Sequence, residues 1–350
     1  MSNEVCHFLA MGEEQFEKDK FLALSSGKDT QRVQWVDIAK GIAIICVIIG
    51  HTVPHGPLRS ALFSFHLPVF FVLSGFTTRL KPVSSMLPSL IRRLIVPYIM
   101  LTAGSRLIAA ALGVEPLLAP LIFIQSLVWG SGVAVNGIPP VGASWFLVCM
   151  FFARLLFVGV SNKMTSLGWH KLSQCITWVV LLIMVVVLHY FDIWLPLSLD
   201  NVPVATFLMW CGYSIKTAGI DWKIVLKPIP LIALASLWMA GVKLSDFEMA
   251  TRLMNPVIVS VVTALLGTTV ITAVSTLLDR YFRYLSLALA WCGRQSMVIY
   301  GVHVLDWVIP FLQITSMLPV PWAWASMLRI GLDITIGACY IKLRKTMTAR

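Results

Sequence analysis

Long apolar runs, separated by short polar stretches, recur along the chain from residue 36 to residue 342. An α-helix needs about 17 to 25 mostly apolar residues to cross a hydrocarbon core about 30 Å thick. The pattern predicts ten membrane-spanning helices, which cover approximately residues 36–53, 61–79, 94–112, 144–160, 176–191, 202–216, 228–242, 255–276, 288–311 and 322–342. A further apolar run, Leu117 to Trp129, is shorter and lies between prolines and glycines, which predicts a re-entrant or interfacial segment.

The composition supports a membrane protein. Of the 350 residues, 58% are hydrophobic and 12% are charged, and the mean hydropathy is +0.84, which excludes an ordinary soluble globular protein. We therefore expect an all-α, polytopic helical bundle of about ten transmembrane helices, with residues 35–342 as one membrane domain. Residues 1–34 lack the features of a signal peptide and are expected to form a cytoplasmic tail. Residues 343–350 are expected to form a basic tail.

The 27 lysines and arginines indicate the orientation of the chain in the membrane. With the N-terminus in the cytoplasm, only Arg59, Lys243 and Arg252 fall in outer loops. This distribution follows the positive-inside rule and predicts that both termini are cytoplasmic. The net charge of +11 is then explained by topology and by contact with anionic lipid headgroups. It does not indicate binding to nucleic acid.

The seven cysteines are scattered, mostly inside the predicted spans and without paired spacing. This placement predicts neither a disulfide framework nor a zinc site. No metal is expected.

The first predicted span carries ionisable residues on one face. Lys40 and His51 are 11 residues apart, which on an α-helix is three turns plus about 20° and a rise of about 16 Å. Asp37 joins this face three residues before Lys40. Ionisable groups inside a span are costly and often mark a substrate or proton path. The alternative is that Lys40 snorkels to the interface and His51 sits in the opposite headgroup region.

Five stretches, in order along the chain, resemble the motifs of the membrane acyltransferase 3 family. They are DIAKGIAIICVIIGH (Asp37–His51), FSFHLPVFFVLSGF (Phe63–Phe76), RRLIVPY (Arg92–Tyr98), SWFLVCMFF (Ser144–Phe152) and CGRQSMVIYGVH (Cys292–His303). The first is similar to the family hallmark of a basic residue, ten residues and a histidine. Lys40, in place of the more frequent arginine, resembles the branch that contains fucose and enterobacterial-antigen O-acetylases.

The resemblance implies an enzyme that transfers an acyl group, usually acetyl, from cytoplasmic acetyl-CoA. The implied acceptor is a hydroxyl of a cell-surface polysaccharide, such as lipopolysaccharide, or of a lipid-linked sugar. The implied location is the bacterial cytoplasmic (inner) membrane, as a multi-pass protein. The expected partners are acyl-CoA, the glycan acceptor and membrane lipids, and a homodimer is retained as a further expectation.

Within this resemblance, basic residues at the cytoplasmic mouth would hold the phosphates of acyl-CoA, because charge-assisted hydrogen bonds suit phosphate oxygens. The expected donor-binding residues are Lys40, Arg92, Arg93 and Arg294. The slender, uncharged pantetheine arm would then pass several helical turns and bring the thioester to His51.

At that point His51 is expected to act as the general base, because a neutral imidazole can take the proton of a sugar hydroxyl. An acyl-histidine intermediate remains an alternative. His66 is expected near His51, either in the chemistry or as a hydrogen-bonded core histidine. Asp37 is expected to hold or balance Lys40, or to form a simple ion pair with it.

Two interpretations outside this assignment stay open. A transporter or flippase would also carry buried charges across many spans, and a non-catalytic glycan export partner would not need the aligned lysine and histidine. His303 is expected to line the acceptor side or to pack against Tyr300. Arg329 and Asp333, four residues apart, are interpreted as a neutralised structural pair.

Overall fold

Helices make up nearly all of the ordered architecture, which confirms the predicted all-α class. The structure is a computed structural model that describes residues 33–168, 171–219 and 224–348. The helices are α2 (Gln34–Gly50), α3 (Pro57–Thr77), α4 (Val83–Leu90), α5 (Val96–Ala111), α6 (Pro120–Trp129), α7 (Trp145–Ser166), α8 (Lys171–Tyr190), α9 (Val202–Thr217), α10 (Pro228–Leu244), α11 (Val257–Tyr281), α12 (Arg283–Arg294), α13 (Ser296–Leu305), α14 (Phe311–Ile314) and α15 (Pro321–Thr348). Strands β1 (Asp246–Glu248) and β2 (Leu253–Asn255) form one short antiparallel hairpin.

Each of the ten predicted spans overlaps at least one of these helices. Within the described residues, four segments are long and apolar enough to cross a membrane, namely Pro57–Thr77, Val83–Ala111, Gly142–Ser166 and Val257–Tyr281. These helices are consistent with a multi-pass membrane protein, whereas the count of ten spans and the cytoplasmic placement of both termini stay predictions. The expected tail 1–34 lies almost entirely outside the described residues.

The predicted span at 288–311 is not one continuous helix. The chain forms α12, breaks at Gln295, continues as α13 and ends in the short 3₁₀ turn η4 (Asp306–Val308). The apolar run at 117–129 forms α6, whose ten residues reach about 15 Å and are too short to cross the hydrocarbon core.

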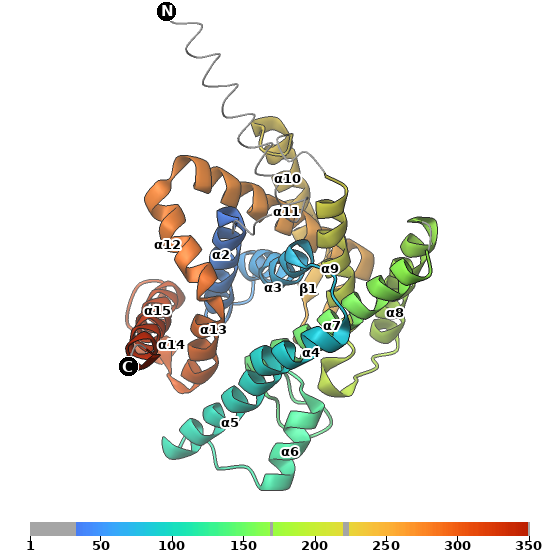
Figure 1. Cartoon of the computed structure of the whole chain (residues 1–350). Coiled ribbons are helices and arrows are strands. Elements are labelled where there is room, and N and C mark those ends of the chain that lie inside the picture. Colours follow the sequence, from blue (N-terminus) through green and yellow to red (C-terminus); the bar gives the residue numbers. More distant parts are fainter. Residues whose placement is uncertain (1–32, 169–170, 220–223, 349–350) are drawn as a thin grey trace, which may run out of the picture.

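The two helices that carry His51 and His66 lie at the centre of the assembly. In Figure 1, α2 and α3 occupy the middle, with α12 along α2 and α9 along α3. Helix α11 contacts both central helices. Positions that the sequence places on these two helices are therefore surrounded by protein on several sides.

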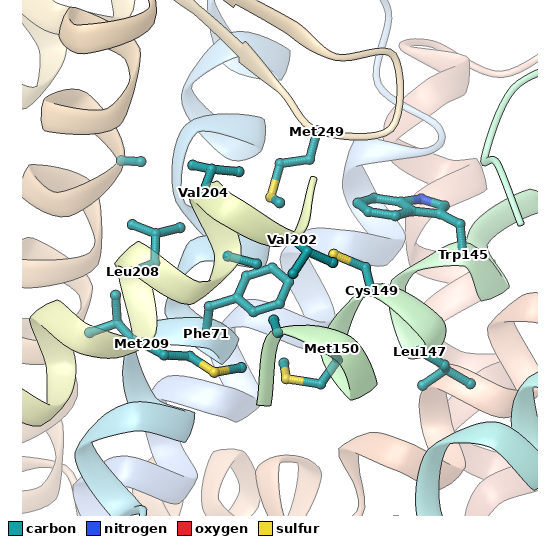
Figure 2. Close-up of a cluster of buried hydrophobic side chains, with 14 of the residues drawn as sticks. Phe71, Trp145, Leu147, Cys149, Met150, Val202, Val204, Leu208, Met209 and Met249 are labelled. Carbon is teal, nitrogen blue, oxygen red and sulfur yellow. The ribbon is translucent and has the colours of Figure 1, made fainter. Parts of the chain in front are cut away.

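An apolar core lies between α3, α7, α9 and the hairpin. Phe71 of α3 is fully buried there, and Figure 2 shows its ring among aliphatic and sulfur-containing side chains. The other labelled members of this core are Trp145, Leu147, Cys149, Met150, Val202, Val204, Leu208, Met209 and Met249. Because the hairpin contributes Met249, the core connects the helices to the segment that borders the cavities described below.

Two helix crossings bring backbone against backbone at glycine. A Cβ atom on Gly41 of α2 would lie 2.0 Å from the carbonyl oxygen of Leu289, and one on Gly293 of α12 would lie 1.7 Å from that of Asp37. The α3–α9 crossing is built in the same way at Gly75 and Gly212. Small residues allow this close approach of membrane helices, and here they fix the position of α2 and α3.

One turn of the helix that runs from Val83 to Ala111 is a π turn, η1 (Ile91–Ile95). The N–H of Val96 bonds to the carbonyl of Ile91, five residues back. The next residue, Pro97, has no N–H, and its ring would clash with the carbonyl four residues before it. The wider turn accommodates the proline and carries Arg92 and Arg93.

Replacing Gly293 by alanine tests the α2–α12 crossing. Since the new Cβ would overlap the Asp37 carbonyl, Gly293→Ala should lower the free energy of unfolding by about 1–3 kcal/mol or more. The matched control is Gly159→Ala in α7, where a Cβ meets no atom within 4 Å and alanine should be neutral or mildly stabilising. Thermal unfolding of the detergent-solubilised protein measures both, and equal melting temperatures for the two variants would contradict the predicted contact.

Candidate functional site

His51 lies at the C-terminal end of α2, where its backbone N–H bonds to the Ile48 carbonyl at 3.3 Å and ends the helix. The residue as a whole is exposed. It lines both of the hollows described next. The histidine that the sequence singled out therefore stands at the junction of two spaces.

The first space is a small cavity of about 60 Å³ between α2, α3, α7, α13 and the hairpin. Its wall is mostly aromatic and aliphatic, and it also contains the His66 ring and the Glu248 carboxylate. The lining residues are Val47, His51, Phe63, His66, Leu67, Ala143, Trp145, Phe146, Phe247, Glu248, Met249, Ala250 and Tyr300. A cavity of this size holds a few water molecules or a group of a few heavy atoms.

The second space is an open groove of about 450 Å³. It lies between the loop after α2 and the start of α15, and its lining is Gly50, His51, Thr52, Val53, Pro54, His55, Arg59, Leu312, Pro321 and Trp322. His51 is the one residue common to both linings.

An ion pair borders both spaces. The Arg59 guanidinium donates two hydrogen bonds to Glu248, at 2.9 and 3.0 Å, and lies over the Phe63 ring at 4.1 Å from its centroid. Glu248 lines the cavity and Arg59 lines the groove. This bidentate pair therefore forms part of the wall between them and joins the hairpin to the start of α3.

The structure places His66 on the same cavity as His51, as the sequence predicted. Its Nδ1 lies 2.7 Å from the Leu62 carbonyl, and because a carbonyl only accepts, Nδ1 carries the hydrogen. The other ring nitrogen, Nε2, is then the unprotonated one. The Phe63 ring lies between the two histidines, with centroids 4.7 Å from His66 and 6.4 Å from His51.

A further histidine, which the sequence analysis expected to line the acceptor side or to pack against Tyr300, lies beside His51. The centroid of the His303 ring in α13 is 5.1 Å from that of His51. His303 is buried, and its Nδ1 is 3.4 Å from Asp333 Oδ2 in α15 and 3.9 Å from Asp306 Oδ1 in η4. More than 250 residues separate the two rings along the chain, so no local spacing could indicate this contact.

Arg329 does not pair with Asp333, contrary to the interpretation from sequence. Its Nε donates to Asp306 Oδ2 at 2.7 Å and its Nη2 donates to the other oxygen of the same carboxylate. Both oxygens of Asp333 are buried without a hydrogen-bond partner. The i,i+4 rule failed because a carboxylate from the neighbouring turn offers both of its oxygens to the planar guanidinium.

His303, Asp306 and Asp333 also offer ligand atoms within 4.8 Å of one another, the one such group found among the described residues. The guanidinium of Arg329 already binds both oxygens of Asp306. The Asp306 carboxylate is therefore already neutralised by a salt bridge. The expectation from sequence that no metal is bound stays a prediction.

The other predicted residues of the first helix lie at its opposite end. Asp37 precedes His51 by 14 residues, a rise of about 21 Å, so the structure does not bring its carboxylate to the cavities. Asp37 is buried, and Arg294 at the end of α12 approaches it at 4.0 Å. Lys40 is half-buried one turn further along α2.

Arg92 and Arg93 are exposed on the π turn. Arg93 is close enough to Arg154 of α7 for their charges to interact. Arg154 was missed by the sequence analysis, although it is a lone cation in an apolar span. Its Nη1 donates to Ser74 Oγ at 3.3 Å, and its buried Nε has no partner.

Comparison with known proteins gave one match. A family model described as an acyltransferase domain matches residues 33–344. Neither the curated proteins nor the solved structures compared with the chain gave a match.

The buried ion pair beneath His303 can be tested by removing its cation. Arg329→Leu leaves the Asp306 carboxylate buried without its partner, and the protein should lose about 3–5 kcal/mol of stability. The double variant Arg329→Leu/Asp306→Asn removes that charge as well and should recover much of the loss. The measurement is thermal unfolding in detergent, and a single variant as stable as the wild type would rule out the pair as a stabilising contact.

Proposed function

Because the chain belongs to the acyltransferase 3 family, we propose that this membrane acyltransferase moves an acetyl group from cytoplasmic acetyl-CoA to a sugar hydroxyl. The acceptor is a cell-surface polysaccharide or a lipid-linked sugar, and the protein works in the bacterial cytoplasmic membrane. The assignment to the O-acetylase branch is part of this proposal and rests on Lys40 in the first motif.

One observation carries the proposal, namely that His51 lines both a small cavity and a wider, open groove. An acyl transfer needs two substrates to meet at one base. The groove is wide enough to admit part of a sugar, and Trp322 and Arg59 in its lining offer an apolar face and hydrogen-bond donors. The cavity would receive the acyl end of the donor.

The size of the cavity favours a short acyl group. A volume of about 60 Å³ suits the three heavy atoms of acetyl, and the rings of Trp145, Phe146 and Tyr300 in the lining leave little room for a longer chain. Close-packed aromatic walls yield little to extra methylene groups.

The reaction is a single displacement at the thioester carbonyl. His51 takes the proton of the sugar hydroxyl while the oxygen forms a bond to the carbonyl carbon. The carbon–sulfur bond then breaks, and the leaving thiolate takes the proton back from His51. The products are the sugar ester and free CoA, with His51 restored. In the alternative, His51 itself attacks the thioester and passes the acetyl group on in a second step.

The opposite end of α2 is assigned to the donor phosphates. Lys40 lies about 16 Å along the helix from His51, a distance suited to the extended pantetheine arm. Arg294 approaches this end through Asp37, and Arg92 and Arg93 are exposed on the π turn. Arg154, whose Nε has no hydrogen-bond partner, adds a further positive charge beside Arg93.

Replacing His51 tests the assignment of the base. His51→Gln keeps a hydrogen-bonding group but cannot shuttle a proton, so acetyl transfer should fall by about 10² to 10⁴ while binding of acetyl-CoA to the purified protein stays near normal. The measurement is donor-dependent acetylation of the surface glycan by mass spectrometry.

The matched control is His189→Gln, a histidine in the last turn of α8, which should retain full activity. Retained acetylation in His51→Gln would refute the role of His51 as base. Absence of any acetyl transfer by the wild type, with movement of a substrate across the membrane instead, would favour the transporter. An acetylated His51 peptide from a rapidly quenched reaction would identify the two-step route.

Replacing Lys40 tests the donor end. Lys40→Ala should raise the KM for acetyl-CoA about 10-fold or more, since a charged hydrogen bond contributes about 1.5–3 kcal/mol, and excess donor should partly restore the rate. Lys40→Arg should keep most of the activity because the charge remains. The control is Lys81→Ala, an exposed basic residue in the loop before α4. Equal loss in both Lys40 variants, without rescue by donor, would contradict phosphate binding.

A further inference from the structure

We propose that His303 and Asp333 are positioning residues for His51, and that the Asp333 charge is matched by the proton that His51 takes during acyl transfer. The inference rests on the proposed function for the nature of the reaction. It goes beyond the assignment of His51 as general base, because it gives a role to His303 and to the buried carboxylate of Asp333.

Asp333, His303 and His51 are successive neighbours in space. Asp333 Oδ2 lies 3.4 Å from His303 Nδ1, and the His303 ring is 5.1 Å from the His51 ring between centroids. With Nδ1 directed to the carboxylate, Nε2 is the nitrogen of His303 left to face another partner. Rings at this separation can bring their nitrogens within hydrogen-bond reach edge to edge.

His303 and Asp333 are buried polar residues whose unpaired atoms cost stability. His303 and Asp333 have side-chain exposures of 1% and 0%, and His303 Nδ1 and both Asp333 oxygens have no hydrogen bond in the resting arrangement. A buried polar atom without a partner costs about 1–3 kcal/mol. Such groups inside a membrane helix bundle are retained mainly where they act.

The cluster contains two carboxylates, Asp306 and Asp333, and one arginine, Arg329. Arg329 binds both oxygens of Asp306 and neutralises one of the two carboxylates. Arg329 makes no hydrogen bond to Asp333, and in the proposed mechanism Asp333 is ionised when acyl transfer begins. One proton on the histidine pair completes the balance, and acyl transfer delivers that proton to His51.

The proton moves over a short path in this arrangement. The acceptor hydroxyl gives its proton to one nitrogen of His51, whose other N–H is held by Nε2 of His303. Asp333 holds Nδ1–H of His303 and favours the imidazolium through that ring, without becoming protonated itself. When the carbon–sulfur bond breaks, the thiolate removes the proton from His51, and His303 and Asp333 return to their starting state.

The test compares Asp333→Asn and His303→Gln with Asp200→Asn. Asp200 is also a buried aspartate beside an arginine, 3.3 Å from Arg252, but it borders neither cavity. Loss of a group that orients a functional histidine costs about 10- to 100-fold. Both site variants should therefore lose that much in kcat for acetyl transfer, with the KM of donor and acceptor nearly unchanged, whereas Asp200→Asn should change stability only.

The double variant His303→Gln/Asp333→Asn should be no slower than the worse single variant, because residues that act as a unit are not additive. Additive losses, or losses confined to KM or to the amount of folded protein, would overturn the inference. So would inactivation of the wild type by EDTA that is reversed by a divalent cation, because His303, Asp306 and Asp333 would then hold a metal.

A readout without acyl transfer separates this inference from the proposed function. Diethyl pyrocarbonate is attacked by the unprotonated imidazole. In a buffer basic enough to keep His51 unprotonated in every variant, the rate follows the nucleophilicity of its free nitrogen, which a hydrogen bond from the other N–H to His303 increases. Mass spectrometry of the peptide containing His51 gives this rate. Asp333→Asn and His303→Gln should slow the modification of His51, whereas Asp200→Asn should not. An unchanged rate in both site variants would overturn the inference even if acyl transfer were confirmed, and a slowed rate would support it even if the acyl donor proved to be a different one.

Discussion

The contact of α2 with α12 through Gly41 and Gly293 is the constraint on which the site depends. At this crossing two helix backbones touch without intervening side chains. Because α2 carries Asp37 near one end and His51 at the other, fixing its backbone fixes the position of both. The equivalent crossing of α3 with α9 fixes the helix of His66. Lipid chains supply no hydrophobic drive to associate helices, so close packing at small residues supplies the contact instead.

The polar groups around His51 differ in how completely they are paired. Arg59 and Glu248 satisfy each other at the edge of the groove, and Arg329 and Asp306 satisfy each other in the interior. Near these two complete pairs lies His51, beside His303 and Asp333, whose Nδ1 and carboxylate oxygens have no hydrogen-bond partner. The complete pairs join the hairpin to α3 and η4 to α15, and in the proposed mechanism the incomplete set responds to a proton. Fixed ion pairs around groups that still have free hydrogen-bonding capacity fit a preorganised catalytic site.

Local patterns predicted the elements and the first helix well. Apolar runs located a helix at every predicted span, and the 11-residue spacing identified His51, which proved to line two cavities. The break at Gln295 was missed because the apolar residues on both sides were joined into one span, although Gly293, Arg294, Gln295 and Ser296 interrupt the apolar pattern there. The contact of His51 with His303 and the pairing of Arg329 with Asp306 depend on how α2, α13 and α15 pack. Spacing along α15 predicted Asp333 as the partner of Arg329. The observed partner, Asp306, comes from η4, and the spacing within one helix carries no information about a residue from another element.

The π turn at Ile91–Ile95 makes the donor end sensitive to chain length. A π turn contains one residue more than an α turn, and one residue corresponds to about 100° of rotation. Deleting a single residue there would remove the wide turn, bring the Pro97 ring against the carbonyl four residues before it, and turn Arg92 and Arg93 by about a quarter of a circle relative to α5. Among related sequences, a one-residue gap at this point would redirect Arg92 and Arg93, the side chains proposed to bind phosphate, while the other four motifs stayed intact. Donor preference could thus diverge through an insertion or deletion that a comparison of residue identities would overlook.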